Sequence, residues 1–306
     1  MCRLHWLVMN APRQNLDLFL DPANRRAFAA HGRHWESNRY VYPVISRRSG
    51  GISIGVNLNP DKICNFDCIY CCVNRKVPGG SPNIDLALLR SELSDMLESV
   101  QNGGIYRVEP FVAVAPELQH LNDIAFSGDG EPTTCPQFFS ACQLVADLLQ
   151  VRQLPDIKIV VITNATMLHR PTIEEALAFL DTHNGEIWAK LDAGTNTYYQ
   201  QVDRSSIAFQ RVLDNITACA RHRPVVIQTL LMRVHGQLPA ESEIDAYINR
   251  INDICAAGGK IKLIQIYTVA RHTTETFATA IPPAELAAIG DRIGAALPNI
   301  AVRIFP

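Results

Sequence analysis

The chain has 306 residues, of which 47% are hydrophobic and 19% charged, and its formal net charge is −2 at pH 7. This composition suits a folded protein with a large buried core, and the near-neutral charge gives no overall signature of a nucleic-acid-binding protein. No apolar run reaches the roughly 18 residues that a membrane-spanning helix needs, and the first residues lack the apolar stretch of a signal peptide. We therefore expect a soluble, cytoplasmic protein with no membrane partner.

The charge is nevertheless uneven along the chain. Residues 1–50 hold eight arginines and three acidic residues, a balance of 8 − 3 = +5. The arginines stand at positions 3, 13, 25, 26, 33, 39, 47 and 48. Such a layer either meets an anion, for example a phosphate backbone, or is a solvated surface. We expect residues 1–50 to form a basic N-terminal extension packed on the main domain, with an amphipathic helix near residues 16–31.

Beyond this segment, short apolar stretches alternate with longer amphipathic ones. The short stretches are rich in β-branched residues, which predicts strands at residues 51–58, 123–128, 157–163, 186–192, 225–231 and 260–268. Apolar residues at helical spacing predict helices over residues 86–100, 138–149, 173–180, 212–220 and 244–255. Strands that alternate with helices predict a parallel α/β sheet, either open or rolled into a complete or partial barrel. In the long insert at residues 101–121 we expect a small hairpin.

The first predicted strand leads directly into a loop with three closely spaced cysteines. Cys64, Cys68 and Cys71 lie within the sequence CNFDCIYC, and Cys72 follows at once. The loop lies at the carboxyl end of the strands, where α/β folds build their functional sites. The remaining cysteines are scattered, so their pattern does not indicate a disulfide framework.

Three thiols in one short loop favour a metal centre. A structural zinc site needs a fourth ligand, for which Cys72 is the nearest candidate. A four-iron cluster held by three cysteines would instead leave one iron open to a ligand from outside the protein, unlike the fully ligated clusters of electron carriers. The spacing favours the cluster and leaves zinc and unrelated buried thiols as alternatives.

The loop resembles the signature of the radical S-adenosylmethionine (SAM) superfamily, C-x-x-x-C-x-aromatic-C, with Tyr70 at the aromatic position. The resemblance implies that Cys64, Cys68 and Cys71 bind a [4Fe-4S] cluster, that SAM chelates the fourth iron, and that Tyr70 lies against the adenine. It also implies that one electron, supplied by a flavodoxin or ferredoxin, cleaves SAM to a 5′-deoxyadenosyl radical. This radical would then abstract a hydrogen atom from the substrate.

A second segment, FSGDGEPTT at residues 126–134, follows the second predicted strand and resembles the Gly-Gly-Glu element of the same superfamily. Asp129, Gly130 and Glu131 occupy the three positions, with Asp129 in place of the first glycine. The resemblance implies that this turn holds the methionyl group of SAM. Taken alone, the segment is also an ordinary turn.

Polar residues close several other predicted strands. Asp192 is a candidate acceptor for ribose hydroxyls, and Asn164 and Gln228 are candidates for adenine or ribose contacts. Each is equally compatible with a helix cap or a satisfied core group. Lys190 is the candidate catalytic residue, because a lysine with a depressed pKa can form a Schiff base with a carbonyl substrate; the alternative is an ion pair with a neighbouring carboxylate.

The wider resemblance covers roughly residues 40–275 and points to the branch of wyosine-type tRNA-modifying enzymes. It implies a partial (β/α)6 TIM-like barrel over residues 51–306, ending in a helix and a final strand, and action on a tRNA base. Archaeal 4-demethylwyosine synthases carry three further cysteines ahead of the motif, whereas this chain has only Cys2 there. A small metabolite or a peptide therefore remains open as the substrate. A non-catalytic iron-sulfur or zinc-binding module is the alternative from a different class.

Overall fold

The computed structural model describes residues 24, 28 and 35–306. Eight strands form one sheet in the order β1-β2-β3-β4-β5-β6-β8-β10. Their bounds are β1 Val41–Ser46, β2 Gly51–Val56, β3 Leu121–Phe126, β4 Lys158–Thr163, β5 Gly185–Lys190, β6 Val225–Leu230, β8 Ile261–Tyr267 and β10 Ala301–Phe305. All neighbouring strands run parallel except β1 and β2, which are antiparallel. A small second sheet pairs β7 (Arg233–Val234) with β9 (Ala278–Thr279).

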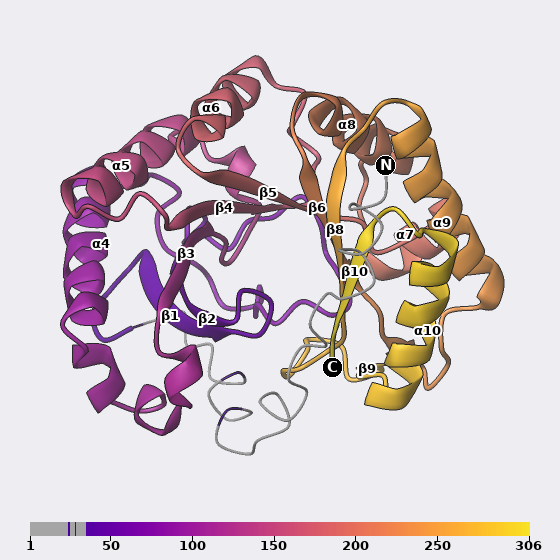
Figure 1. Cartoon of the computed structure of the whole chain (residues 1–306), viewed down its shortest axis with the longest axis horizontal. Coiled ribbons are helices and arrows are strands. Elements are labelled where there is room, and N and C mark those ends of the chain that lie inside the picture. The colour runs from indigo at the N-terminus through magenta and orange to yellow at the C-terminus, as the bar shows by residue number, and fades with distance from the viewer. Residues whose placement is uncertain (1–23, 25–27, 29–34) are drawn as a thin grey trace, which may run out of the picture.

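The sheet curls into an open arc, and the long helices cover its outer face (Figure 1). The helices are α4 Leu86–Gln101, α5 Phe138–Val151, α6 Pro171–Asp181, α7 Asn196–Val202, α8 Phe209–His222, α9 Glu241–Ala256 and α10 Pro283–Ala296. This arrangement confirms the predicted partial barrel: the six predicted strands and the five predicted helices are present, together with α7, which was not predicted. Helix α10 and strand β10 follow the last of these strands. The helix expected near residues 16–31 lies outside the described residues apart from positions 24 and 28, and the packing of residues 1–50 as a separate extension remains a prediction.

The period of two along each strand divides the core into two layers. Ile124, Ile159 and Ile187 belong to the main apolar core between the sheet and the helices. The residues that follow them in sequence, Ala125, Val160 and Trp188, face the other way. Together with Val226 they form a separate apolar cluster on the inner face of the arc. The inner face therefore has its own apolar floor, on which a ligand site can be built.

Strand β1 adds an edge to the sheet that the sequence analysis did not predict. A buried carboxylate holds it there: Glu92 of α4 accepts hydrogen bonds from the backbone N–H groups of Arg39, Tyr40 and Val41 at 2.7, 2.8 and 3.1 Å. Charge-assisted bonds of this kind are stronger than neutral ones. These bonds fix the start of β1 to α4.

The insert before β3 contains no hairpin. Three short 3₁₀ turns occupy it, at Gly104–Arg107, Phe111–Ala113 and Pro116–Leu118. The expectation of a hairpin was wrong because Pro110 and Pro116 each remove a backbone N–H that a strand ladder would need.

Candidate active site

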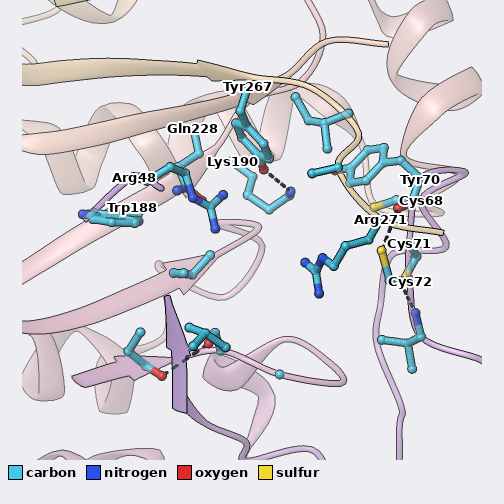
Figure 2. A pocket seen from close by; sticks show the side chains of 18 of the residues that line it. Arg48, Cys68, Tyr70, Cys71, Cys72, Trp188, Lys190, Gln228, Tyr267 and Arg271 are labelled. Carbon is cyan, nitrogen blue, oxygen red and sulfur yellow. Dashed lines mark hydrogen bonds between the residues drawn. The ribbon is translucent and has the colours of Figure 1, made fainter. Parts of the chain in front are cut away.

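A pocket of about 280 Å³ lies on the inner face of the arc and reaches the carboxyl ends of the strands. Of the site residues predicted from the sequence, all but two line it directly. Those lining it are Cys64, Cys68, Tyr70, Cys71, Gly130, Glu131, Asn164, Lys190 and Gln228. Asp129 and Asp192 lie behind the lining residues. The Asp129 carbonyl accepts a hydrogen bond from Arg75, and the Asp192 carboxylate accepts one from Tyr70. Several of these side chains point into one space (Figure 2).

The cysteine loop is anchored to the end of α7. The N–H groups of Asp67 and Ile69 donate to the carbonyls of Asp203 and Val202 at 3.1 and 2.9 Å. All three motif cysteines are half-buried, whereas Cys72 is exposed. Burial raises the pKa of Cys64 to about 11. In the metal-free chain the thiol is therefore protonated at neutral pH, and metal binding must displace its proton.

Arg75 connects the cysteine loop with the glycine-rich turn. Its Nη1 donates to the carbonyl of Asp129 at 2.8 Å and to the carbonyl of Lys62. Its Nη2 donates to the sulfur of Cys71 at 3.6 Å, and its Nε is buried without a hydrogen-bond partner among the described residues. Nε and Nη2 share one edge of the guanidinium group, so the unsatisfied N–H lies on the edge that faces the sulfur.

The glycine-rich turn packs tightly on the cysteine loop. A Cβ at Gly130 would clash with the backbone carbonyl of Ile63, so only glycine fits there. Asp129, which replaces the first glycine of the family element, pairs reciprocally with Asn57: Asn57 Nδ2 donates to Asp129 Oδ2 at 2.8 Å, and Asp129 N–H donates to Asn57 Oδ1 at 3.1 Å. Gly130 therefore serves the close contact between the two loops, and the binding of the methionyl group by this turn remains a prediction.

Glu131 and Asn164 are held largely by the protein itself. The Glu131 carboxylate is buried and accepts hydrogen bonds from Thr163 Oγ1 at 2.7 Å and from the Asn164 N–H at 2.6 Å, besides those from Thr133. Burial raises its pKa, against these hydrogen bonds. The side chain of Asn164 donates to Asn65 Oδ1 at 2.7 Å. Both residues fix the cysteine loop and the glycine-rich turn to the end of β4, and their contacts with SAM remain predictions.

Lys190, Asp192 and Tyr70 form a buried polar network next to Cys68. Lys190 Nζ lies 3.6 Å from Asp192 Oδ2 and 4.8 Å from the centre of the Tyr70 ring, and the Tyr70 hydroxyl donates to Asp192. Asp203 accepts from Cys68 Sγ at 3.5 Å and from the Tyr70 hydroxyl at 3.4 Å. Burial lowers the pKa of Lys190, but its anionic neighbours, with Asp192 foremost, raise it above the usual value. The ion pair weighed from the sequence is thus present, and the amine is charged.

Gln228 differs from these residues because part of its hydrogen-bonding capacity is unused. Its Nε2 donates to Gln265 Oε1 at 2.9 Å, but its buried Oε1 has no hydrogen-bond partner among the described residues. A buried acceptor without a donor costs free energy on the order of 1–3 kcal/mol. Since Gln228 lines the pocket, a ligand with an N–H or O–H group would satisfy it.

The three cysteines fit a cubane cluster. In the described part of the chain no three ligand-type side chains converge on a single metal ion. A four-iron cluster takes each thiolate on a different iron, so its ligands need not converge on one point. Three half-buried thiols line one pocket, and the unsatisfied Nε–H of Arg75 shares a guanidinium edge with the donor to Cys71. These are the groups that a sulfide-rich cluster would meet.

The fold and the site together define a class: an α/β partial-barrel protein with a three-cysteine cluster loop at the carboxyl end of its strands. The family model of the radical SAM superfamily matches residues 58–241, which is more than half of the chain. The chain therefore belongs to the radical SAM superfamily, as the motif predicted. As a member of this superfamily it is an enzyme whose cofactors are a [4Fe-4S] cluster and SAM.

Two curated relatives are 24% identical to the chain. The UPF0026 protein of Helicobacter pylori matches over 215 residues, 69% of this chain and 62% of the relative. The protein named GTPase Obg of Brachyspira hyodysenteriae matches over 255 residues, 82% of this chain and 33% of the relative. The chain thus spans one third of the length of one relative and about six tenths of the other.

Two solved structures share the fold at 13% sequence identity. SuiB of Streptococcus suis bound to S-adenosylmethionine superposes with a TM-score of 0.57, over 84% of this chain and 51% of SuiB. TYW1 with a bound lysine-pyruvate adduct gives a TM-score of 0.52, over 90% of this chain and 82% of TYW1.

As to membranes, none of the helices in the described residues has the length and apolar character needed to cross a bilayer.

Proposed function

We propose that this radical SAM enzyme abstracts a hydrogen atom from a base of tRNA in the cytoplasm. The observation that carries the general function is the pocket, which brings Cys64, Cys68 and Cys71 together with the unsatisfied acceptor of Gln228. The tRNA substrate is supported by the sequence resemblance to wyosine-type enzymes and by the basic residues 1–50. A peptide or a small metabolite would be the substrate if tRNA does not bind.

Each predicted site residue has a role in this proposal. Cys64, Cys68 and Cys71 hold the cluster, which when bound supplies the electron that cleaves SAM. Tyr70 packs against the adenine, and its burial keeps water from that side of the pocket. The backbone of the turn from Asp129 to Glu131 holds the methionyl group. Asn164 and Asp192 bind the nucleoside of SAM, whereas Gln228, predicted from the sequence as a further nucleoside ligand, offers its unused acceptor to the substrate.

We propose that the electron comes from a flavodoxin or ferredoxin that docks near Cys72. Cys72 is exposed and adjoins the cluster ligand Cys71, so this part of the loop reaches the surface of the described structure. A cluster close to the surface shortens the path from an external donor.

Lys190 is the proposed catalytic residue. A bound lysine-pyruvate adduct in TYW1 makes covalent attachment of a carbonyl substrate to Lys190 the reaction to test. Attachment requires the charged amine to lose a proton, for which Asp192 at 3.6 Å is the acceptor at hand, and it releases one water. Borohydride reduction in the presence of pyruvate should add the reduced adduct to the Lys190 peptide, as seen by mass spectrometry. An unmodified Lys190 peptide would rule this role out, and Lys190→Arg is the control.

Anaerobic reconstitution tests the general function. Reduction with dithionite in the presence of SAM should release 5′-deoxyadenosine, detected by chromatography and mass spectrometry. Cys68→Ala should abolish the release, whereas Cys72→Ala, which removes the adjacent exposed thiol, should retain it. A non-catalytic iron-sulfur or zinc-binding module would release none from the unchanged protein.

Binding of tRNA tests the substrate. A polynucleotide substrate predicts an affinity that falls steeply with salt and on neutralising Arg25 and Arg26, which lie outside the described residues. An affinity for tRNA that is absent, or insensitive to both changes, would favour a small molecule or a peptide.

A further inference from the structure

Besides Arg75 at the cysteine loop, three arginines line the active-site pocket. Arg47 and Arg48 come from the turn between β1 and β2, and Arg271 comes from the segment after β8. Burial, and then the charges of Arg48 and Arg271, lower the pKa of Arg47 to about 10. Like charges in one pocket repel each other, so an anion bound among them would be stabilised.

No carboxylate among the described residues forms an ion pair with Arg47 or Arg48. The guanidinium of Arg48 instead lies 4.6 Å from the centre of the Tyr267 ring and 5.9 Å from the centre of the Trp188 ring. Arg47 donates to the carbonyl of Pro306. The carboxyl group of Asp123 is buried and accepts a hydrogen bond from Ser53 of β2. Burial raises the pKa of Asp123, and the positive charge of Arg48 lowers it only as a minor effect. The two cations are thus held by aromatic faces and a carbonyl.

The arginine end of the pocket is separate from the cysteine end. Figure 2 shows Arg48 beside Trp188 on one side and Cys68 with Cys71 on the other, with Lys190 and Tyr267 between them. In the proposed function the acidic group of SAM binds at the iron, and therefore at the cysteine end. Arg48 consequently lies where the substrate, and not the methionyl group, would be.

Gln228 provides a second and independent sign of a ligand. It is 0% exposed and lines the same pocket, and its Oε1 has no hydrogen-bond partner among the described residues. The Arg48 guanidinium offers donors and a positive charge, whereas Gln228 Oε1 offers only an acceptor. Together they complement a molecule with an acidic group and a nearby N–H or O–H.

We propose that the arginine end of the pocket, formed by Arg47, Arg48 and Gln228, binds an acidic group of the substrate. The group is a phosphate or a carboxylate, and Gln228 accepts a hydrogen bond from an N–H or O–H of the same molecule. This inference rests on the proposed function, because the cofactor must occupy the cysteine end. In this proposal Arg47 and Arg48 bind the substrate inside the pocket. This role is separate from any contact between the basic N-terminal segment and a polynucleotide.

Calorimetry on the anaerobically reconstituted full-length protein with SAM tests the proposal. The probes are inorganic phosphate, succinate, guanosine 5′-monophosphate and guanosine. We expect an acidic probe to bind, and the monophosphate to bind more tightly than the uncharged nucleoside. Tighter binding of phosphate compounds identifies a phosphate source, and tighter binding of succinate identifies a carboxylate source.

The variants show whether the arginines are responsible. Arg48→Gln should weaken binding of the acidic probe by about tenfold or more, as expected for loss of a charge-assisted hydrogen bond. Arg48→Lys keeps the charge and should lose less. Arg211→Gln removes an exposed arginine of α8 and should change nothing. If Arg48→Gln does not fold, Arg47→Gln and Arg48→Lys carry the same test.

The inference fails if no acidic probe binds more tightly than its neutral partner, or if the folded arginine variants bind as the unchanged protein does. Release of 5′-deoxyadenosine is measured on the same preparations without a substrate. Release together with arginine-independent binding overturns this inference alone. A protein that binds the acidic probes through its arginines but neither holds iron nor cleaves SAM would instead overturn the proposed function.

Discussion

Replacement of Arg75 should lower the reduction potential of the cluster. The Arg75 guanidinium lies next to Cys71, with Nη2 at 3.6 Å from the sulfur, and brings one positive charge to the site. A positive charge stabilises the reduced cluster, which is more negative than the oxidised one. At separations of about 5–8 Å and an effective dielectric constant of about 20, Coulomb's law gives about 2–3 kcal/mol, or about 90–140 mV for one electron. We expect Arg75→Met to shift the potential in the negative direction by this order.

A redox titration followed by electron paramagnetic resonance measures the shift. Arg75→Lys is the matched variant, because it keeps the charge but loses the forked donor edge, and its shift should be less than half as large. Iron content and circular dichroism must be compared as well, since Arg75 also holds the carbonyls of Lys62 and Asp129. A folded, iron-loaded Arg75→Met protein with an unchanged or more positive potential would refute the reasoning.

Three further predictions concern stability. Gly130→Ala should lower the melting temperature and the iron content, because the added Cβ clashes with the Ile63 carbonyl; normal values would contradict the tight loop contact. Glu92→Gln should cost about 1.5–3 kcal/mol of unfolding free energy in urea titrations, through weaker bonds to β1, and a cost near zero would contradict this. Burial raises the folded-state pKa of Asp123, so the folded chain binds its proton more tightly and loses stability as pH rises from about 4 through that pKa. Asp123→Asn should lack this loss in urea titrations at several pH values; an equal loss in both proteins would contradict the assignment.

The fold followed from the sequence where apolar periodicity was strong. The six predicted strands and the five predicted helices lie within a few residues of the observed ranges, because both faces of such strands are buried. The short helix α7 was not predicted. Strand β1 was missed because Pro43 interrupts its pattern, although proline is tolerated on an edge strand. Its position depends on Glu92, which is about 50 residues away in sequence, and no local pattern reveals such a contact.

The candidate site was predicted only in part. The three cysteines were recognisable from their local spacing. Asn164, Lys190 and Gln228 were expected at one edge of the sheet because each lies near the carboxyl end of a predicted strand. Arg75 was not predicted, although it is a basic residue only four positions after Cys71, and this proximity in sequence could have indicated a contact with the cysteine loop. Asp203 and Trp188 carried no such signal: Asp203 meets Cys68 through the end of α7, and Trp188 is an ordinary apolar residue in its strand.

The most direct test of the cluster assignment is the electron paramagnetic resonance spectrum of the reduced, reconstituted protein before and after addition of SAM. If three cysteines hold a four-iron cluster with one open iron, the preparation should contain about four irons per chain, and its signal should change when SAM binds. Iron that is absent, or a cluster signal that SAM leaves unaltered, would contradict the account.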